Sequence, residues 1–597
     1  MDELLSHCSN LSDPEVLTGL QRGPDPNQTI GLTDVIVIGN GPSALALSCL
    51  LSGSEPFYDL SHPHPIRQIH DNLSQQSADT IPLTHIDLEE LCSVAEGRGG
   101  NPISLLYDQL VRPEADIGHD HPSCIRWDCR PPHPSAPASQ PSSHIPHLIL
   151  GRGKPGGSWP TFPSHLKTLS FGSWLDLPAY SFDDFLTSRR RKRIKRRKKR
   201  CCVIGQCGAG KNEDAVANNT PGSKTGDLDP DGLSDDLGSL ERDRRVRCEL
   251  VEDYFMDYVS QLALWKHFLC QSNVTSVTPV RLPGGQPSGD HRLLWDVRGF
   301  HGLGPFWFRA SRVVLATGCP VPRHIGCPGE QAFPGWVYHS LNPFLKVLDQ
   351  LSPQESAHAQ VSEEEPLPIL VVGAGLSAAD AITEALHRRV PVIHVFNNSR
   401  GILARLSPSV YPEYYSVGRL MRSPAARATV SEEVARYDAC PGCVLERFEE
   451  EEEEEEDLKK GKCGKKWRFA VIRSTNRSSG TAEEGESSTT RRIPISAAII
   501  QIGYVADLSF LSGELVRRLE KFSGLEIDGK NNMLRINPYT YEVQEDLLAE
   551  EEIQNDAEPL SGLYALGPLV GDNYVRYGVG GAFGVASDLM KQLDRKP

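Results

Sequence analysis

The chain has 597 residues, which is enough for about two to four domains. Its formal net charge of −16 disfavours general nucleic-acid binding, because attraction to phosphate needs a basic surface. Hydrophobic residues make up only 39% of the chain, beside 45 prolines and 52 glycines, so we expect an ordered core with disordered inserts.

The N-terminal region, residues 1–30, is predicted to be disordered. It begins with an acidic segment and lacks the basic and then apolar pattern of a signal peptide. The 15 cysteines are therefore expected to be reduced thiols of a cytoplasmic protein. Residues 35–53 carry no charge, but the glycine-rich turn at their centre argues against a transmembrane segment, because it would expose backbone polar groups to lipid.

This turn follows a predicted buried strand, opens an apolar helix and has the pattern Gly-x-Gly-x-x-Ala. The first glycine permits a sharp turn, the second lets a pyrophosphate approach the backbone, and the small third residue lets helix and strand pack closely. We predict a dinucleotide site here, with a tight turn that binds nothing as the alternative. Its residues are Gly39, Asn40, Gly41, Pro42 and Ala44.

The next part of the chain is harder to assign. Residues 60–145 are rich in His, Pro and Ser and are predicted to be an insert with a few helical patches, followed by a strand at 147–151. Residues 189–200 are basic at every position except Ile194. We predict a solvated loop for this basic run, with a nuclear import signal or a contact with anionic lipid or RNA as alternatives.

A second strand–glycine–helix unit occupies residues 367–398 and has the same glycine spacing as the first. It predicts a second dinucleotide site at Gly373, Gly375, Ser377 and Ala378. Arg400 follows the next strand, where a guanidinium can pair with the 2′-phosphate that distinguishes NADPH from NADH. A solvated surface arginine is the alternative for Arg400.

An acidic insert is predicted over about residues 440–492, and its unbroken run from Glu449 to Asp457 is expected to be solvated. Cys440 and Cys443 at its start have the spacing of a redox dithiol, which makes a flavin disulfide reductase one alternative. They lie in polar sequence outside any predicted strand–helix–strand unit, so two solvated thiols are the simpler interpretation.

Strands alternating with helices predict the α/β class with parallel sheets. We expect two Rossmann-like, three-layer dinucleotide-binding domains. The first is expected over residues 31–188, 248–330 and 511–597, the second over 331–510, and a basic, low-complexity insert over 189–247.

Four further segments accompany the glycine loops. They contain Gly156, Gly157 and Trp159; Thr317 and Gly318; Phe333, Gly335 and His339; and Gly567 and Asp572. In this order, over roughly residues 33–590, they resemble flavin-dependent monooxygenases with two dinucleotide domains. Six stretches resemble, more narrowly, a divergent branch of these enzymes, the oxidative stress-induced growth inhibitor family. These are GNGPSALALSCLLSG, RPEADIGHDHPS, IPHLILGRGKPGGSW, GAGLSAADA, VYPEYYSVGRLM and ALGPLVGDNYVRY.

The resemblance implies FAD at the first loop and NADPH at the second. NADPH would reduce the flavin, O₂ would give a C4a-hydroperoxide, and one oxygen atom would pass to an unidentified small molecule or protein side chain. The family is linked to growth restraint, cell death and cytokinesis, in the cytoplasm and at the midbody. We expect no metal and assign no catalytic side chain, because the flavin chemistry needs a shielded pocket more than a proton shuttle.

Within the resemblance, Trp159 contacts the flavin site, with core packing as its alternative, and His339 is a hinge or an NADP contact. Gly567 and Asp572 face the flavin ring and ribityl chain. One departure weakens this assignment: the strand before Gly156 ends without the carboxylate that should bind ribose. A non-catalytic regulator that keeps the fold and binds protein partners through the charged inserts is therefore another alternative.

Overall fold

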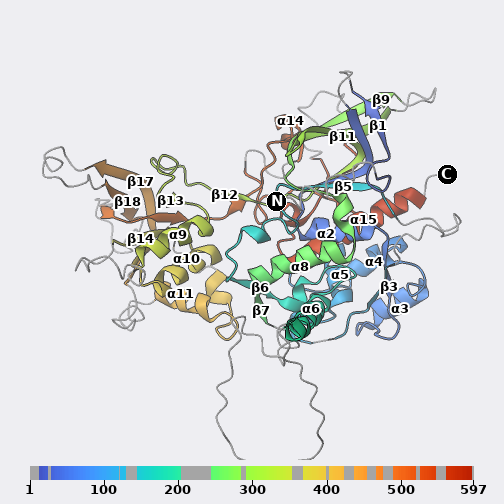
Figure 1. Cartoon of the computed structure of the whole chain (residues 1–597), viewed down its shortest axis with the longest axis horizontal. Helices are drawn as coiled ribbons and strands as arrows, with labels where there is room; N and C mark the ends of the chain where they lie inside the picture. Colours follow the sequence, from blue (N-terminus) through green and yellow to red (C-terminus); the bar gives the residue numbers. More distant parts are fainter. Residues whose placement is uncertain are drawn as a thin grey trace, which may run out of the picture. The chain divides into compact units, whose positions relative to one another are not determined.

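The structure is a computed structural model, and it describes residues 13–23, 29–119, 121–129, 144–203, 244–283, 291–352, 367–397, 402–422, 436–452, 466–474, 489–519, 525–545 and 560–594. The chain divides into two compact units, each built of strands and helices (Figure 1). Unit 1 comprises residues 1–160, 164–319 and 506–597, and unit 2 comprises residues 161–163 and 320–505. Apart from residues 161–163, the chain crosses between the units at residues 319/320 and 505/506.

Unit 1 is built on an eight-stranded sheet in the order β8-β5-β2-β11-β10-β9, with β1 paired to β2 and β22 to β11. These strands are β1 (Gly19–Arg22), β2 (Thr29–Ile38), β5 (His147–Leu150), β8 (Phe268–Leu269), β9 (Asn273–Pro283), β10 (His291–His301), β11 (Gly304–Leu315) and β22 (Leu563–Ala565). Strands β8, β5, β2, β11 and β22 are parallel, whereas β9, β10 and β11 form an antiparallel meander. The parallel part confirms the predicted α/β class.

Three helices of unit 1 pack closely because small residues lie between them. Helix α2 (Pro42–Leu51) is buried from Ala44 onward. Helix α15 (Val575–Asp594) contacts α2 and α5 (Pro102–Val111). A Cβ added at Gly578 would lie 2.4 Å from Oγ of Ser43, and one at Gly580 would lie 2.5 Å from Cα of Ser104. The C-terminal helix therefore depends on glycine where it crosses the helix that follows the first glycine loop.

Part of the region predicted to be disordered or inserted belongs to this core. Strand β1 pairs with β2, and Val16 is fully buried, so the prediction of disorder over 1–30 is wrong for residues 13–22. Within residues 60–145, Leu83, Leu106 and Leu110 are fully buried. The elements of this segment and its flanks are β3 (Ser54–Tyr58), α3 (Arg67–Gln75), α4 (Glu89–Cys92), α5 and β4 (Ile125–Cys129).

The basic run is helical rather than a loop, which corrects the prediction. It lies in α6 (Phe182–Val203), and the helix start is capped reciprocally by Ser181 and Asp184. Arg and Lys are strong helix formers, so the run continues the helix that this cap begins. Two of its side chains pair with α8 (Cys248–Gln261): Arg189 contacts Asp253, and Lys192 Nζ lies 2.7 Å from Asp257 Oδ1.

Unit 2 has a five-stranded parallel sheet in the order β13-β20-β14-β15-β16 and a separate three-stranded sheet, β17-β18-β19. The strands are β12 (Val321–Pro322), β13 (Val337–Tyr338), β14 (Ile369–Val372), β15 (Val392–Phe396), β16 (Tyr437–Pro441), β17 (Cys443–Glu452), β18 (Lys466–Ser474), β19 (Thr490–Pro494), β20 (Ala498–Ile500) and β21 (Tyr504–Val505). The helices include α9 (Leu341–Leu351), α10 (Leu376–His387) and α11 (Pro412–Arg422).

The predicted acidic insert contains part of this framework. The first four residues of the acidic run, from Glu449, lie in strand β17, and both oxygens of Glu449 accept bonds, from Arg447 at 2.8 Å and Arg492 at 2.6 Å. Cys440 is buried on β16, at the edge of the parallel sheet, so its predicted place in solvated polar sequence is wrong. Residues 453–457 lie outside the described residues.

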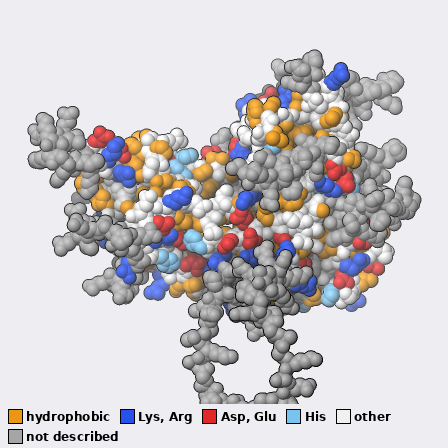
Figure 2. Space-filling model, viewed as in Figure 1, with side chains coloured by type: hydrophobic (Ala, Val, Ile, Leu, Met, Phe, Trp, Pro, Cys, Tyr) orange, Lys and Arg blue, Asp and Glu red, His pale blue; other side chains and the backbone are white. Residues whose placement is uncertain are grey.

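Side chains of both signs are interspersed over the face shown in Figure 2. Among the described helices, none combines the length and the apolar composition that crossing a bilayer requires.

Candidate functional site

The first glycine loop is a tight turn between β2 and α2. Gly39 has a φ of +110°, and a Cβ added there would lie 2.2 Å from the carbonyl oxygen of Ala316, at the end of the neighbouring strand β11. Its N–H donates to the carbonyl of Leu150 at 2.8 Å. Both the backbone angle and the lack of space exclude any side chain at this position.

The start of α2 is arranged to receive an anion. Gly41 occupies the N-cap and offers no side-chain acceptor, and Pro42 is the first helical residue. The N–H groups of a first helical turn have no partner within the helix, and the helix dipole adds partial positive charge there. Ala44 is fully buried, as expected for the residue at which helix and strand approach closely.

The Gly156–Gly157 segment lies directly against this loop. A Cβ added at Gly157 would be 2.9 Å from Cα of Gly41, so the two glycines face each other without side chains between them. The N–H of Gly156 donates to the carbonyl of Asn40 at 2.8 Å. The buried Asn40 amide donates in turn to the carbonyls of Gly153 and Lys154 at 2.8 and 3.0 Å. The structure thus brings the two predicted segments together.

Two further predicted segments of unit 1 are the residues that follow β11, Thr317 and Gly318, and the C-terminal segment that contains Gly567. The Thr317 hydroxyl is buried and has no hydrogen-bond partner within the described part of the chain. Gly318 has a φ of +62° and open space where its side chain would be. A Cβ at Gly567 would lie 3.4 Å from Oγ of Ser43. An orphaned buried hydroxyl beside bare backbone suits a bound ligand.

Asp572 is held by the protein itself. It is 2% exposed, its Oδ1 accepts from the N–H and side-chain amide of Asn101 at 3.3 and 3.1 Å, and its Oδ2 accepts from the Tyr541 hydroxyl at 2.5 Å. Burial raises the pKa of this carboxyl to about 7. Asn101 and Tyr541 were not predicted, and no local pattern marks residues so far apart in the chain. A flavin contact of Asp572 stays a prediction.

The structure also shows the contacts of two other predicted features of unit 1, Trp159 and the residues that follow β5. The Trp159 ring packs edge-on against Phe255, with centroids 6.1 Å apart, as its core-packing alternative expects. Strand β5 is the parallel neighbour of β2, and it is followed by Gly151 and Arg152 rather than by a carboxylate. The Arg152 guanidinium pairs with Asp507 at 2.7 Å. A basic residue thus occupies the place where the ribose-binding acid was expected.

The second glycine loop, in unit 2, repeats the construction of the first. Gly373 has a φ of +129°, and its added Cβ would lie 2.2 Å from the carbonyl oxygen of Gln501. Gly375 is the N-cap of α10, and a Cβ there would meet nothing within 4 Å. Ser377 lies in the first turn of α10, and Ala378 is buried. This loop also presents a free helix N-terminus to an anion.

A histidine forms a hydrogen bond with the backbone of this second loop. The Nε2–H of His394 on β15 donates to the Gly373 carbonyl at 2.6 Å, and the Tyr437 hydroxyl donates to Nδ1 at 2.7 Å. Burial lowers the pKa of His394 to about 4, so the ring is neutral at neutral pH. Sequence reasoning missed His394, although a polar residue inside the apolar strand Val392–Phe396 is a usable signal.

The linker motif lies in the same unit. The Phe333 ring stacks on Trp336 at 5.0 Å, and a Cβ at Gly335 would meet nothing within 4 Å. The His339 carbonyl accepts from the Gln501 side chain at 2.9 Å, which joins the linker to the residue packed against the second loop. Arg400 lies outside the described residues.

No protein-family model matches the chain. Its sequence is 30% identical over 590 residues to oxidative stress-induced growth inhibitor 2 of Homo sapiens, covering 94% of each chain. The chain belongs to the oxidative stress-induced growth inhibitor family. The resemblance found in the sequence is thereby confirmed over nearly the whole length of this family member.

Two solved structures are similar to the chain at low sequence identity. Bacillithiol disulfide reductase from Bacillus cereus is 13% identical, with a TM-score of 0.46 over 94% of this chain and 99% of that chain. An ornithine N-hydroxylase from Kutzneria sp. 744 is 13% identical, with a TM-score of 0.45 over 94% of this chain and 100% of that chain. Neither likeness decides the chemistry of this family member.

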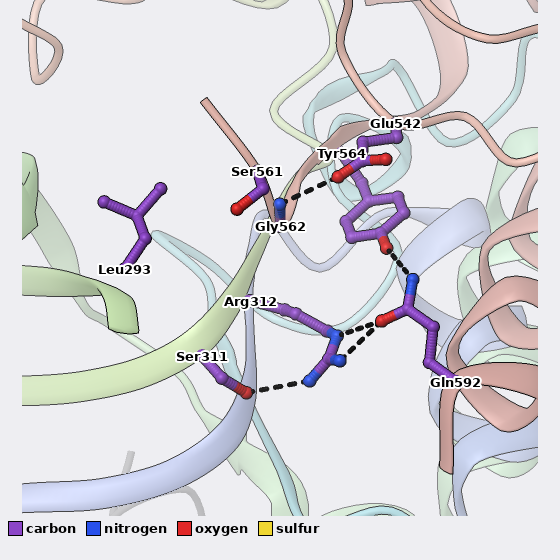
Figure 3. A pocket seen from close by; sticks show the side chains of 8 residues that line it. All are labelled: Leu293, Ser311, Arg312, Glu542, Ser561, Gly562, Tyr564 and Gln592. Atoms are coloured by element: carbon purple, nitrogen blue, oxygen red, sulfur yellow. Dashed lines mark hydrogen bonds between the residues drawn. The ribbon is translucent and has the colours of Figure 1, made fainter. Parts of the chain in front are cut away.

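A cavity of about 370 Å³ in unit 1 is lined by residues other than the predicted cofactor residues (Figure 3). Its polar groups bond mainly to one another: Arg312 donates to Gln592 and Ser311, and the Gly562 N–H donates to Glu542. We assign no ligand to this cavity.

Proposed function

We propose that this family member is an FAD-containing, NADPH-dependent oxidoreductase, and specifically a flavin-dependent monooxygenase. The observation that carries the proposal is the duplicated loop. Gly39 and Gly373 each have a φ above +100° and a missing Cβ 2.2 Å from a strand-end carbonyl, and each leads to a helix whose N-cap is glycine. Two such loops provide for two dinucleotides.

The residues of unit 1 fit FAD. The α2 N-terminus would hold its pyrophosphate, and Gly41 has no side chain that would hinder the approach. The buried Thr317 hydroxyl would gain the partner it lacks within the described residues. Arg152 in place of the ribose-binding acid shifts adenosine recognition to other contacts, which is the main difference from the usual pattern.

The residues of unit 2 fit NADPH. The α10 N-terminus would hold its pyrophosphate, and Gly375 leaves that approach open. Arg400 would pair with the 2′-phosphate. Bound FAD would supply the capacity to take reducing equivalents from NADPH and pass them to O₂, while the chain would hold both cofactors and exclude water. Its substrate is a small molecule or a protein side chain.

We place this activity in the regulation of cell growth, cell death or cytokinesis, in the cytoplasm and at the midbody. The membership of the growth inhibitor family supports this assignment. The basic helix α6 would also serve as a nuclear import signal. Eleven of the residues in 189–200 are Lys or Arg, a composition that such signals use.

The absorption spectrum of the purified full chain tests the cofactor assignment. We expect flavin bands that bleach when NADPH is added without oxygen and return when air is admitted. A chain that stays colourless after incubation with excess FAD would contradict the proposal. An oxygen-dependent NADPH oxidation with a product that carries one oxygen atom from O₂ would distinguish a monooxygenase from a reductase.

Two alanine substitutions test the role of each loop separately. Gly41 and Gly375 have ordinary φ values of −75° and −91°, and their added Cβ atoms meet nothing closer than 4.0 Å, so both variants should fold. Gly41→Ala should lose FAD. Gly375→Ala should keep FAD but lose reduction by NADPH at least about tenfold, because its Cβ blocks the pyrophosphate. Gly153→Ala, with open space at its Cβ, is the matched control.

A second candidate function is a non-catalytic regulator that keeps the fold, and Arg152 is the observation that favours it. If the cellular effect of the protein survives Gly41→Ala and Gly375→Ala, the scaffold function is supported and the enzyme function is contradicted.

A third candidate is a disulfide reductase. It is supported by the position of Cys440 on β16, the edge strand of the sheet, three residues before Cys443. Replacing both cysteines by serine decides between the two enzymes, because a monooxygenase keeps its NADPH oxidation and a dithiol reductase loses turnover of disulfides.

A further inference from the structure

Two imidazoles of unit 2 converge on one buried carboxylate oxygen. Oε1 of Glu330 lies 2.8 Å from Nε2 of His339 and 3.2 Å from Nδ1 of His324. The centroids of the two histidine rings are 4.4 Å apart. The three potential ligand atoms all lie within 4.8 Å of one another. Three residues of one continuous stretch, residues 324–339, thus present one donor atom each to a common point.

The carboxylate at the base of this cluster is fixed by the backbone. The N–H of Gly326 donates to Oε2 of Glu330 at 2.7 Å, and the N–H of Ile325 donates to Oε1 at 3.1 Å. The Glu330 side chain is 1% exposed, whereas that of His324 is 40% exposed. The cluster is therefore rigid at its acidic end and open to solvent at one imidazole.

We propose that His324, Glu330 and His339 form a binding site for a divalent cation of the zinc class. Two imidazoles and a carboxylate are a donor set that zinc uses with an open fourth position. Metal–ligand bonds of about 2.1 Å in a tetrahedron place the donor atoms roughly 3.4 Å apart. The observed 2.8 and 3.2 Å separations reach that spacing by small side-chain rotations.

Two other groups of His and Glu in the described part of the chain show why this one is favoured. In the group around Glu114, the carboxylate is 26% exposed and the His119 ring is 57% exposed, so water competes for every donor. In the group around Glu15, the same carboxylate oxygen already contacts the ammonium of Lys266, a cation that a metal would have to displace. Glu330 is buried, and a cation would take the place of the ring hydrogens that now point to its oxygen, once each neutral imidazole carries its hydrogen on the other ring nitrogen.

Metal titration of the full chain tests the site independently of any flavin activity. Protein stripped with a chelator is titrated with Zn²⁺ against a chromophoric competitor, and with Co²⁺ to report the ligand type by its visible spectrum. The wild-type chain should bind one equivalent that His324→Ala and Glu330→Gln each weaken at least about tenfold. The double variant His119→Ala/His121→Ala is the matched control and should bind like wild type.

Two results would overturn the site. Unchanged Zn²⁺ affinity in His324→Ala would show that the imidazole is no ligand, and a thiolate-to-cobalt charge-transfer band would place the ion on cysteine instead. If Glu330→Gln does not fold, His324→Ala decides alone, because the His324 side chain is 40% exposed and lies outside the hydrophobic core.

Discussion

The two glycine loops of this chain share one construction but are supported in different ways. In unit 1, the loop is held by hydrogen bonds of neutral amides. The Asn40 side chain donates to two backbone carbonyls, and the Gly156 N–H donates to the carbonyl of Asn40. In unit 2, the carbonyl of Gly373 is held by the ring of His394. The turn itself is dictated by sterics, so it recurs, whereas the support is free to vary.

This difference shows which features of a glycine loop are set by its own neighbouring residues and which are set by distant parts of the chain. The backbone angle of the first glycine and its contact with a strand-end carbonyl follow from joining a parallel strand to a helix in few residues. The supporting group comes from a different strand or loop in each unit. It also differs in chemistry, because an amide does not titrate and an imidazole does.

Alanine at the first glycine of either loop should produce the largest effect. Each Cβ would lie 2.2 Å from a backbone oxygen, and the φ values of +110° and +129° are strained for any side chain. Gly39→Ala and Gly373→Ala should each lower the free energy of unfolding by about 3 kcal/mol or more, as measured by chemical denaturation.

The same experiment checks whether the two loops are equivalent. Gly41→Ala and Gly375→Ala serve as controls in the cofactor-free chain, because their backbone angles suit alanine, and each should lower the free energy of unfolding by no more than about 1 kcal/mol, the cost of alanine at an N-cap. Equal stability of Gly39→Ala and Gly41→Ala would refute the steric account of the turn.

Much of this organisation could be predicted from the sequence. Both loops and the strand before Gly156 follow from apolar runs next to glycine, which are local signals. The supports could not be predicted, because Asn40 meets Gly153 and Gly373 meets His394 only after the sheets form. The same applies to Asp572, whose partner Asn101 lies 471 residues away.

The errors have physical reasons as well. The charge of the basic run favours a solvated loop, yet the run is helical because Arg and Lys have high helix propensity and Ser181 and Asp184 cap the helix start. The acidic run is expected to be solvated, yet its first residues lie in β17, where Glu449 and Glu450 are half-buried and Glu449 pairs with arginines. Cross-strand partners supplied by distant sequence decide such segments.

Acid should destabilise the second loop by the next largest amount. The pKa of His394 is lowered to about 4 by burial, so the unfolded chain binds a proton below about pH 6.5 and the folded chain does not. The stability that this neutral ring provides is present above about pH 6.5 and is lost as the pH falls towards 4. Linkage over this window amounts to about 3 kcal/mol.

The variant His394→Gln isolates this effect. Between about pH 7 and pH 4, the wild-type chain should lose about 3 kcal/mol more unfolding free energy than the variant. Buried His267 in unit 1, whose pKa burial lowers to about 3, titrates in both proteins and cancels in the comparison. Parallel stability curves for the two proteins would show that His394 is not the acid-sensitive support.

Removing the amide support of the first loop should have the smallest of the three effects and should not depend on pH. Asn40→Ala deletes bonds of 2.8 and 3.0 Å to the carbonyls of Gly153 and Lys154 and leaves both acceptors without that donor. Since part of this segment is exposed, water replaces some of the loss, and we expect a cost of about 2 kcal/mol. Chemical denaturation at about pH 7 and pH 5 should give the same difference from wild type, because an amide has no proton to exchange in this range. A cost that grows as the pH falls would mean that a titratable group, and not the Asn40 amide, holds the loop, and the contrast between the two units would then disappear.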